Sequence, residues 1–189
     1  MLEVVMHHWA KSAVVTVACI VVASYVLSFL LPALRPMRRT VLFLSLALTL
    51  APLSVTVGKA MSDRHCPWDI DEFGGLVPFR GLFEELGAGI KPGHCFPAGH
   101  AATGFALMAF YFAAYALRRT RVARLTLWCG IVAGLGLGIG RVFQGAHFAS
   151  HVIWSGILCW TVMVALYAVL LAHRTDLGHG NPSEFAPTE

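Results

Sequence analysis

Residues 140–151 place ionisable side chains between two long apolar runs of the chain. Arg141 carries a planar guanidinium whose donors suit the oxygens of a phosphate group. His147 and His151 stand four residues apart, so they face each other if they share a helical turn. Because ionisable groups are costly to desolvate at the mouth of membrane helices, they indicate a function there. The alternative is that these side chains have no function and only lie at a helix end among the lipid headgroups. This segment alone leaves both interpretations open.

Two further polar groups come earlier in the chain. Lys59 ends one apolar run, and residues 97–100 open another with the sequence Pro-Ala-Gly-His. Lysine and arginine would bind a phosphate and stabilise the additional negative charge of its transition state. Backbone N–H groups at the start of a helix, here around Gly99, also favour an anion. With His100 in this group, one histidine can attack phosphorus while another protonates the leaving oxygen, and no metal is needed.

The elements that position these groups follow from the composition. The chain has 189 residues, of which 57% are hydrophobic and only 13% are charged. A soluble domain carries about twice that share of charged residues. The sequence therefore predicts an all-α integral membrane protein, and it contains no repeat or linker that would divide the bundle. The net charge of +4 comes mostly from two arginine clusters, and nothing resembles a nucleic-acid module.

Five apolar segments are predicted to cross the membrane. They are residues 12–31, 40–57, 98–117, 125–140 and 150–172. The first segment is longer than the core of a typical secretory signal and is followed by arginines, so we interpret it as a retained helix. Residues 1–10 are interpreted as an interfacial lead-in. The alternating glycines at 134–140 predict close contact between helices.

Arginines in two short loops, at residues 35–39 and 118–124, predict the cytoplasmic side of the membrane. The N-terminus would then lie outside, and residues 58–97 would form a long outer loop. Within this loop, residues 79–86 are predicted to form a short interfacial helix with Leu82, Phe83 and Leu86 facing lipid. We expect residues 1–174 to form a single domain and residues 175–189 a mobile cytoplasmic tail. All three polar groups would reach the outer face.

The order and spacing of the three groups resemble the type 2 phosphatidic acid phosphatase superfamily. The family pattern is Lys, six residues, Arg-Pro; then Pro-Ser-Gly-His; then Ser-Arg, five residues, His, three residues, Asp. In this chain, Lys59 matches the start of the first part, residues 97–100 match the second part and residues 140–151 match the third part. The resemblance implies that His147 is a nucleophile forming a phosphohistidine and that His100 is the general acid. It also implies that Lys59 and Arg141 hold the phosphate oxygens.

The sequence departs from this pattern at several positions. Cys66 stands where the family has the first arginine, and Arg64 is the candidate substitute. Small residues replace both serines. His151 stands where an aspartate would fix the tautomer of the nucleophile and stabilise its positive charge. A neutral His151 can still accept the N–H bond of His147, but it brings no negative charge, so reduced activity, altered pH dependence and lost catalysis all stay open.

Two cysteines of the predicted outer loop, Cys66 and Cys95, adjoin the first and second polar groups. If that face is oxidising, a disulfide between them would tie the two groups together.

The chain has nine histidines, and a metal site is an alternative to the phosphatase hypothesis. His94, His100, His147 and His151 would form its cluster on the outer face, and imidazoles suit zinc, copper or iron. No pair of them has the added cysteine or carboxylate spacing of a known metal motif. The leading hypothesis therefore assigns no metal and no cofactor.

By resemblance, the leading hypothesis is a phosphatase at the outer face of a bacterial inner membrane, acting on a phosphorylated lipid. Its head group would enter under the loop while its tails stay in the bilayer. Candidate substrates are undecaprenyl pyrophosphate, phosphatidylglycerol phosphate, phosphatidic acid and lipid A phosphates. Two alternatives stay open: a phosphotransferase between two such lipids, and a non-catalytic membrane protein that binds an anionic lipid.

Overall fold

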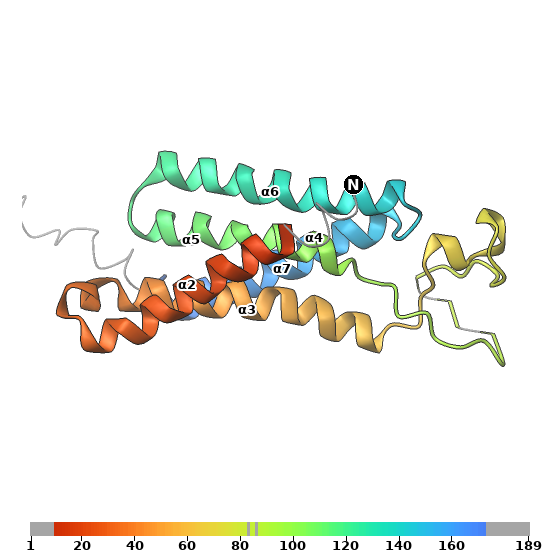
Figure 1. Cartoon of the computed structure of the whole chain (residues 1–189), viewed down its shortest axis with the longest axis horizontal. Helices are drawn as coiled ribbons and strands as arrows, with labels where there is room; N and C mark the ends of the chain where they lie inside the picture. Colours follow the sequence, from red (N-terminus) through yellow and green to blue (C-terminus); the bar gives the residue numbers. More distant parts are fainter. Residues whose placement is uncertain (1–9, 83, 86, 173–189) are drawn as a thin grey trace, which may run out of the picture.

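The computed structural model describes residues 10–82, 84, 85 and 87–172, and these residues form a bundle of helices (Figure 1). Their only β-type pairing is one isolated bridge between Ile70 and Val77. The α-helices are α2 (Ala10–Leu30), α3 (Arg38–Met61), α4 (Gly99–Phe105), α5 (Ala109–Ala116), α6 (Thr120–Phe143) and α7 (Ala149–Leu170). The 3-10 helices are η2 (Pro32–Met37), η3 (Pro67–Asp69), η4 (Asp71–Phe73) and η5 (Ala106–Met108). The all-α prediction is confirmed.

Each of the five predicted membrane spans corresponds to a helical segment of the structure. Four of these segments are single helices long and apolar enough to cross a membrane: α2, α3 extended by η2, α6 and α7. The third predicted span is formed by α4, η5 and α5, which follow one another without a gap over residues 99–116 and include one 3-10 turn. The helical membrane bundle is thus confirmed.

The core of the bundle lies where α4 and α5 meet α3, α6 and α7. Phe43 and Ala47 of α3, Ala101 of α4 and Met163 of α7 are fully buried there. Helix α2 lies at the periphery, where it packs mainly against α3 and leaves most of its apolar side chains exposed. A largely apolar, exposed surface of this kind is expected where lipid surrounds a helix.

The three polar groups of the sequence meet at one end of the bundle, which we call the loop end (Figure 1). The segment between α3 and α4 projects beyond the helices there, and the turn between α6 and α7 lies at the same end. Backbone bonds join these segments: Trp68 N–H donates to the Gly145 carbonyl at 3.1 Å, and Ala98 N–H donates to the His151 carbonyl at 3.2 Å.

The described residues of the segment 79–86 do not form the predicted interfacial helix. The carbonyls of Gly81 and Glu84 accept hydrogen bonds from the Arg64 guanidinium, and the Gly81 carbonyl also accepts the Glu84 N–H at 3.1 Å in a single turn. The helical turns of this loop are η3 and η4 instead. The predicted tail and the predicted lead-in before residue 10 lie outside the described residues.

Close contact between α4 and α6 depends on glycine. A Cβ atom on Gly104 would lie 2.5 Å from the backbone nitrogen of Gly134, and one on Gly134 would lie 2.2 Å from the Phe105 ring. Gly136, in contrast, faces open space. The prediction that glycines allow helix contact is therefore right for one face of α6 and does not apply to Gly136.

We expect Gly104→Ala to lower the free energy of unfolding by about 1–3 kcal/mol, because the new methyl group meets backbone that cannot turn aside. Gly136→Ala is the matched control, and helix propensity predicts an unchanged or slightly higher stability for it. Melting temperatures of the purified variants in detergent would check this. Equal effects at both positions would contradict the close approach of α4 and α6.

Candidate active site

The turn between α6 and α7 positions His147. Helix α6 ends at Phe143, and Gly145 reverses the chain with a left-handed φ of 69°. Its N–H donates to the Val142 carbonyl at 2.9 Å, and the N–H of Ala146 donates to the Arg141 carbonyl at 3.0 Å. These bonds close the C-terminus of α6 and fix the direction in which His147 leaves it.

His147 and His151 form a buried pair of imidazoles. Their side chains are exposed by only 4% and 5%, and their Nδ1 atoms lie 3.4 Å apart. The rings of Phe96 and Phe148 pack edge-on against His151, with centroids 5.2 and 5.4 Å away. These rings enclose His151. The two histidines face each other, as predicted for a shared helical turn, although His147 precedes α7.

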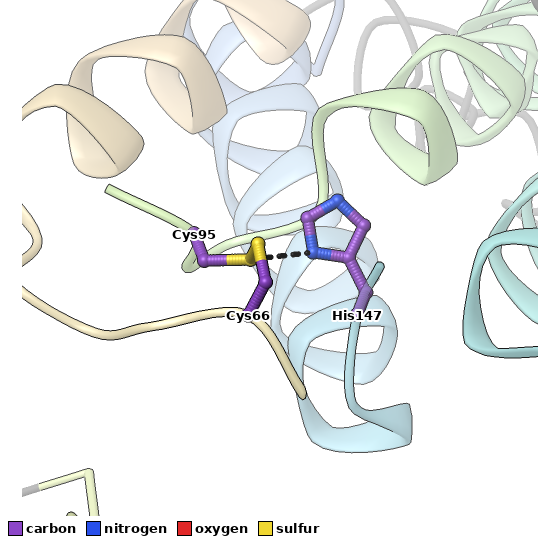
Figure 2. A group of neighbouring side chains, drawn as sticks. All are labelled: Cys66, Cys95 and His147. Carbon is purple, nitrogen blue, oxygen red and sulfur yellow. Dashed lines mark hydrogen bonds between the residues drawn. A yellow bond between two sulfur atoms is a disulfide. The ribbon is translucent and has the colours of Figure 1, made fainter. Parts of the chain in front are cut away.

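A disulfide lies directly against the ring of His147. Cys66, which follows α3, is bonded to Cys95, which precedes α4, and the Cys95 sulfur is 3.4 Å from Nδ1 of His147 (Figure 2). A disulfide sulfur carries no proton, so it can accept a hydrogen bond but cannot donate one. The surroundings of Nδ1 therefore favour the tautomer with its proton on Nδ1, which leaves the lone pair of Nε2 free.

The electrostatic surroundings of His147 keep it neutral. Burial is the largest cause that lowers its pKa, to about 3; the positive charges of Lys59 and Arg141, and those of His151 and His100 when they are protonated, act in the same direction. His147 lies between α6 and α7, outside the spans, and the other groups come from α7, α3, α6 and α4. Four helices therefore bring the predicted residues to one imidazole, which stays unprotonated at neutral pH.

Arg141 is held beside this site by the end of its own helix. One Nη donates to Oε1 of Gln144 at 2.6 Å, and the guanidinium carbon lies 5.8 Å from the centre of the Trp68 ring. Its Nε is buried and has no acceptor among the described residues. Sequence analysis assigned no role to Gln144, although its position three residues after Arg141 is the spacing at which helical side chains meet.

The start of α4 is fastened to α7. Ser155 donates from its hydroxyl to the Ala98 carbonyl at 3.0 Å, which complements the bond from the Ala98 N–H to the His151 carbonyl. His100 and Gly99 then line a groove of about 360 Å³ together with Lys59 of α3. These three residues, assigned to catalysis or phosphate binding, thus share one cavity.

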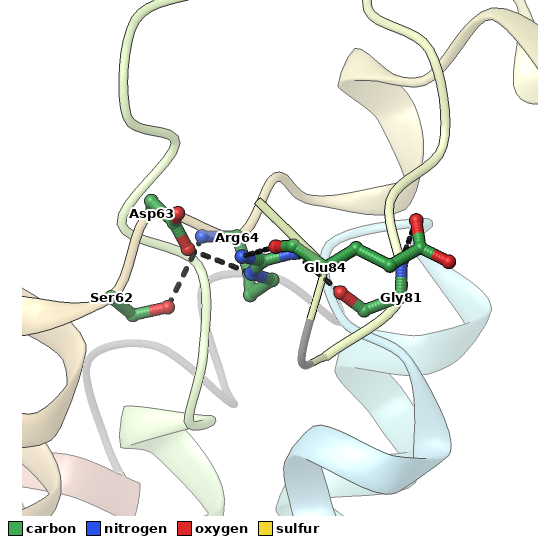
Figure 3. Close-up of polar contacts among 5 residues, drawn as sticks. All are labelled: Ser62, Asp63, Arg64, Gly81 and Glu84. Carbon is green, nitrogen blue, oxygen red and sulfur yellow. Dashed lines mark hydrogen bonds and ion pairs between the residues drawn. The ribbon is translucent and has the colours of Figure 1, made fainter. Parts of the chain in front are cut away.

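Arg64 occupies a different place from the other predicted phosphate ligands. Its Nε contacts Oδ1 of Asp63 at 2.7 Å, and its two Nη atoms donate to the carbonyls of Gly81 and Glu84 (Figure 3). All three guanidinium nitrogens are therefore engaged in fastening the loop. These bonds use three of the five N–H donors of Arg64 and hold its guanidinium against the loop.

The alternative metal cluster of four histidines is not gathered in the described part of the chain. His94 is exposed on the loop. The one group of three potential ligand atoms found among the described residues comprises Cys66, Cys95 and His147, and its two sulfurs are joined in the disulfide. Neither sulfur is a thiolate in this state, so the group lacks the ligands that a metal would take.

Comparison with known proteins identifies the family. The family model described as PAP2 superfamily matches residues 40–174, which is more than half of the chain. The chain therefore belongs to the PAP2 superfamily, the type 2 phosphatidic acid phosphatase family that its motifs resemble.

Among curated proteins, the chain is similar to the "Lipid A 4'-phosphatase" of Francisella tularensis subsp. novicida (strain U112), at 30% identity over 137 residues. The match covers 70% of this chain and 59% of the relative, so the chain spans less than two thirds of that protein. No solved structure was found to match.

We expect the double substitution of Cys66 and Cys95 by alanine to lower the free energy of unfolding by about 3–4 kcal/mol, because the bond closes a loop of 29 residues. Dithiothreitol should lower the melting temperature of the native protein in the same way. Cys129→Ala, which removes an exposed free thiol, is the control. A melting temperature that does not respond to reductant would contradict a stabilising disulfide.

Proposed function

We propose that this protein is a membrane lipid phosphatase that works through a phosphohistidine on His147. The observation that carries the proposal is the state of His147: it is buried and neutral, with Nδ1 occupied and Nε2 free. The cationic groups whose charges act on it are those that a phosphate needs. The buried Nε of Arg141, which lacks an acceptor among the described residues, supports a missing anionic ligand.

In the proposed reaction, Nε2 of His147 attacks phosphorus and the bond to the leaving lipid oxygen breaks. His100 gives its proton to that oxygen, which leaves as an alcohol or, from a pyrophosphate, as a phosphate. His100 then takes a proton from water, whose oxygen attacks the phosphohistidine and releases inorganic phosphate. Lys59 and Arg141 neutralise the equatorial oxygens in both steps. None of these steps requires a metal ion.

His151 is the proposed orienting residue. Its Nδ1 accepts a hydrogen bond from the Nδ1–H group of His147 across the 3.4 Å contact. An aspartate has this role in the family pattern. The acceptor is neutral when His151 is unprotonated, so it fixes the tautomer without a counter-charge. This difference also favours the second candidate function, a non-catalytic protein that binds an anionic lipid.

The proposed substrate is a phosphorylated membrane lipid, presented at the outer face of the membrane. The chain's family and the name of its relative support a lipid phosphate, and arginines in the α2–α3 and α5–α6 connections support an outer location for the loop end. Lipid A phosphates, phosphatidic acid, phosphatidylglycerol phosphate and undecaprenyl pyrophosphate are the panel to test. Transfer of the phosphoryl group to a second lipid would use the same intermediate.

The direct test measures phosphate release from this panel by purified protein in detergent with EDTA present. We expect release by the native protein and a loss of about 10³-fold or more for His147→Ala, because the nucleophile is removed. Folding of the variant is checked by its melting temperature. A well-folded His147→Ala protein that retains the native rate would exclude the phosphohistidine. If no lipid is hydrolysed and none transfers phosphate, the non-catalytic binder is the better description.

The neutral neighbour of His147 predicts an unusual pH dependence. We expect His151→Asp to raise the pKa of His147, because a carboxylate beside Nδ1 stabilises the imidazolium. Only neutral His147 is a nucleophile, so its pKa governs the acid side of the pH profile of kcat/KM. We expect that side of the profile to shift to higher pH by about 1–3 units. His151→Asn, which adds no charge, is the matched control. An equal shift in both variants would rule out a charge effect.

A further inference from the structure

The groove beside Lys59 and His100 extends well beyond the groups that the proposed reaction uses. It runs between α2 and α3, with α4 at its polar end. The α3 side of the groove is a single row at helical spacing, formed by Lys59, Thr56, Pro52 and Leu48. Val15 and Ala18 of α2 form the opposite wall. One end of the groove is therefore cationic and the remainder is apolar.

We infer that this α2–α3 groove holds an acyl chain of the lipid whose phosphate lies at Lys59 and His100. The inference rests on the proposed function and deepens it, because it places the tail of the substrate. The groove is continuous with the phosphate-binding end, so a single amphipathic molecule can occupy both parts. An anionic head and an apolar tail match the order of charge and hydrophobicity along it.

The length of the groove fits a lipid tail. From Leu48 to Lys59 the row advances eleven residues, or about 16 Å along the helix axis. This is about half of the roughly 30 Å thickness of the hydrocarbon core, the depth available to a chain of one leaflet. A substrate in the outer leaflet could thus keep its tail parallel to its neighbours while its phosphate lies at His100.

The hydroxyl groups in the groove do not oppose an apolar ligand. Thr56 donates to the Pro52 carbonyl at 3.0 Å, and Thr103 donates to the Gly99 carbonyl at 3.3 Å. Both donors are therefore satisfied within their own helices, and an acyl chain that covers them leaves no N–H or O–H donor unpaired. Below its cationic end, the groove demands no polar partner from its ligand.

A second groove, of about 380 Å³, lies between α3 and α7 and is the competing place for the tail. Its lining includes Leu158 and the ion pair of Asp63 with Arg64, but neither Lys59 nor His100. The charge of Arg64, the one cation among its lining residues, is balanced by the Asp63 carboxylate, so this groove offers no net positive charge to an anionic head group. Charge complementarity therefore favours the α2–α3 groove.

The test is steric and uses two phosphatidates, one with dioleoyl and one with dihexanoyl chains. We expect Thr56→Trp and Ala18→Trp, which fill the groove from opposite walls, to lower the ratio of kcat/KM for long over short chains about tenfold or more, because a displaced tail misplaces the phosphate. Leu158→Trp in the second groove and Ile20→Trp, on the part of α2 outside the groove, are controls. Their ratios should stay within about twofold of the native value.

A ratio unchanged by both groove variants would overturn the inference, as would a drop confined to Leu158→Trp. Location is checked without turnover by photo-crosslinking a diazirine-bearing acyl phosphatidate to the His147→Ala protein. Mass spectrometry should then find the label on α2 or on residues 48–56 of α3, and labelling of α7 around Leu158 would contradict it. If the native protein releases no phosphate from either phosphatidate, a long-chain and short-chain pair of another lipid in the panel takes their place; if no lipid of the panel is hydrolysed, the proposed reaction fails, whereas the crosslink still decides the place of the tail.

Discussion

Burial of the His147 imidazole among positive charges is the constraint on which the rest of the site depends. Burial and the neighbouring cations both oppose protonation, so the ring is kept in the form that has a free lone pair. In the proposed reaction, His147 can act as a nucleophile only if that lone pair is on the nitrogen that faces phosphorus. The Cys95 sulfur and Nδ1 of His151, each 3.4 Å from Nδ1 of His147, provide that selection.

Holding these groups around one ring requires four helices to end at the same level. The glycine contact between α4 and α6 allows the third span to lie deep in the bundle, and the bond from Ser155 to the Ala98 carbonyl ties its start to α7. The disulfide joins the end of α3 to the same point. Each fastening therefore acts on a different pair of helices, and together they restrain the distances at the loop end.

Much of this arrangement could be predicted from sequence because it depends on patterns that are local. Apolar runs of membrane length predicted the helices. The order of charged residues at the ends of these runs predicted that the three polar groups lie at the same end of the bundle. Two loop cysteines next to two of those groups suggested the disulfide that the structure contains. The tautomer of His147 was not accessible in this way, because it depends on a contact between residues 52 positions apart.

The same reasoning explains the errors. The segment 79–86 has an amphipathic pattern, but its Gly81 and Glu84 carbonyls bind Arg64, which is 17 and 20 residues away in sequence, so a local pattern does not reveal this contact. The 3-10 turn η5 within the third span is likewise invisible to hydropathy, which reports side chains and not backbone hydrogen bonds.

The replacement of aspartate by His151 changes how charge can be balanced during the proposed reaction. When Nε2 of His147 bonds to phosphorus, the ring becomes cationic, and the family pattern supplies a carboxylate to compensate. No carboxylate is among the groups whose charge acts on His147 in the described part of the chain. The nearest negative charge in the reacting complex is therefore the phosphoryl group itself. A more highly charged phosphate would compensate the positive ring better. With His151 in place of aspartate, the protein supplies no counter-ion, so the rate of the proposed reaction should depend more strongly on the charge of the substrate.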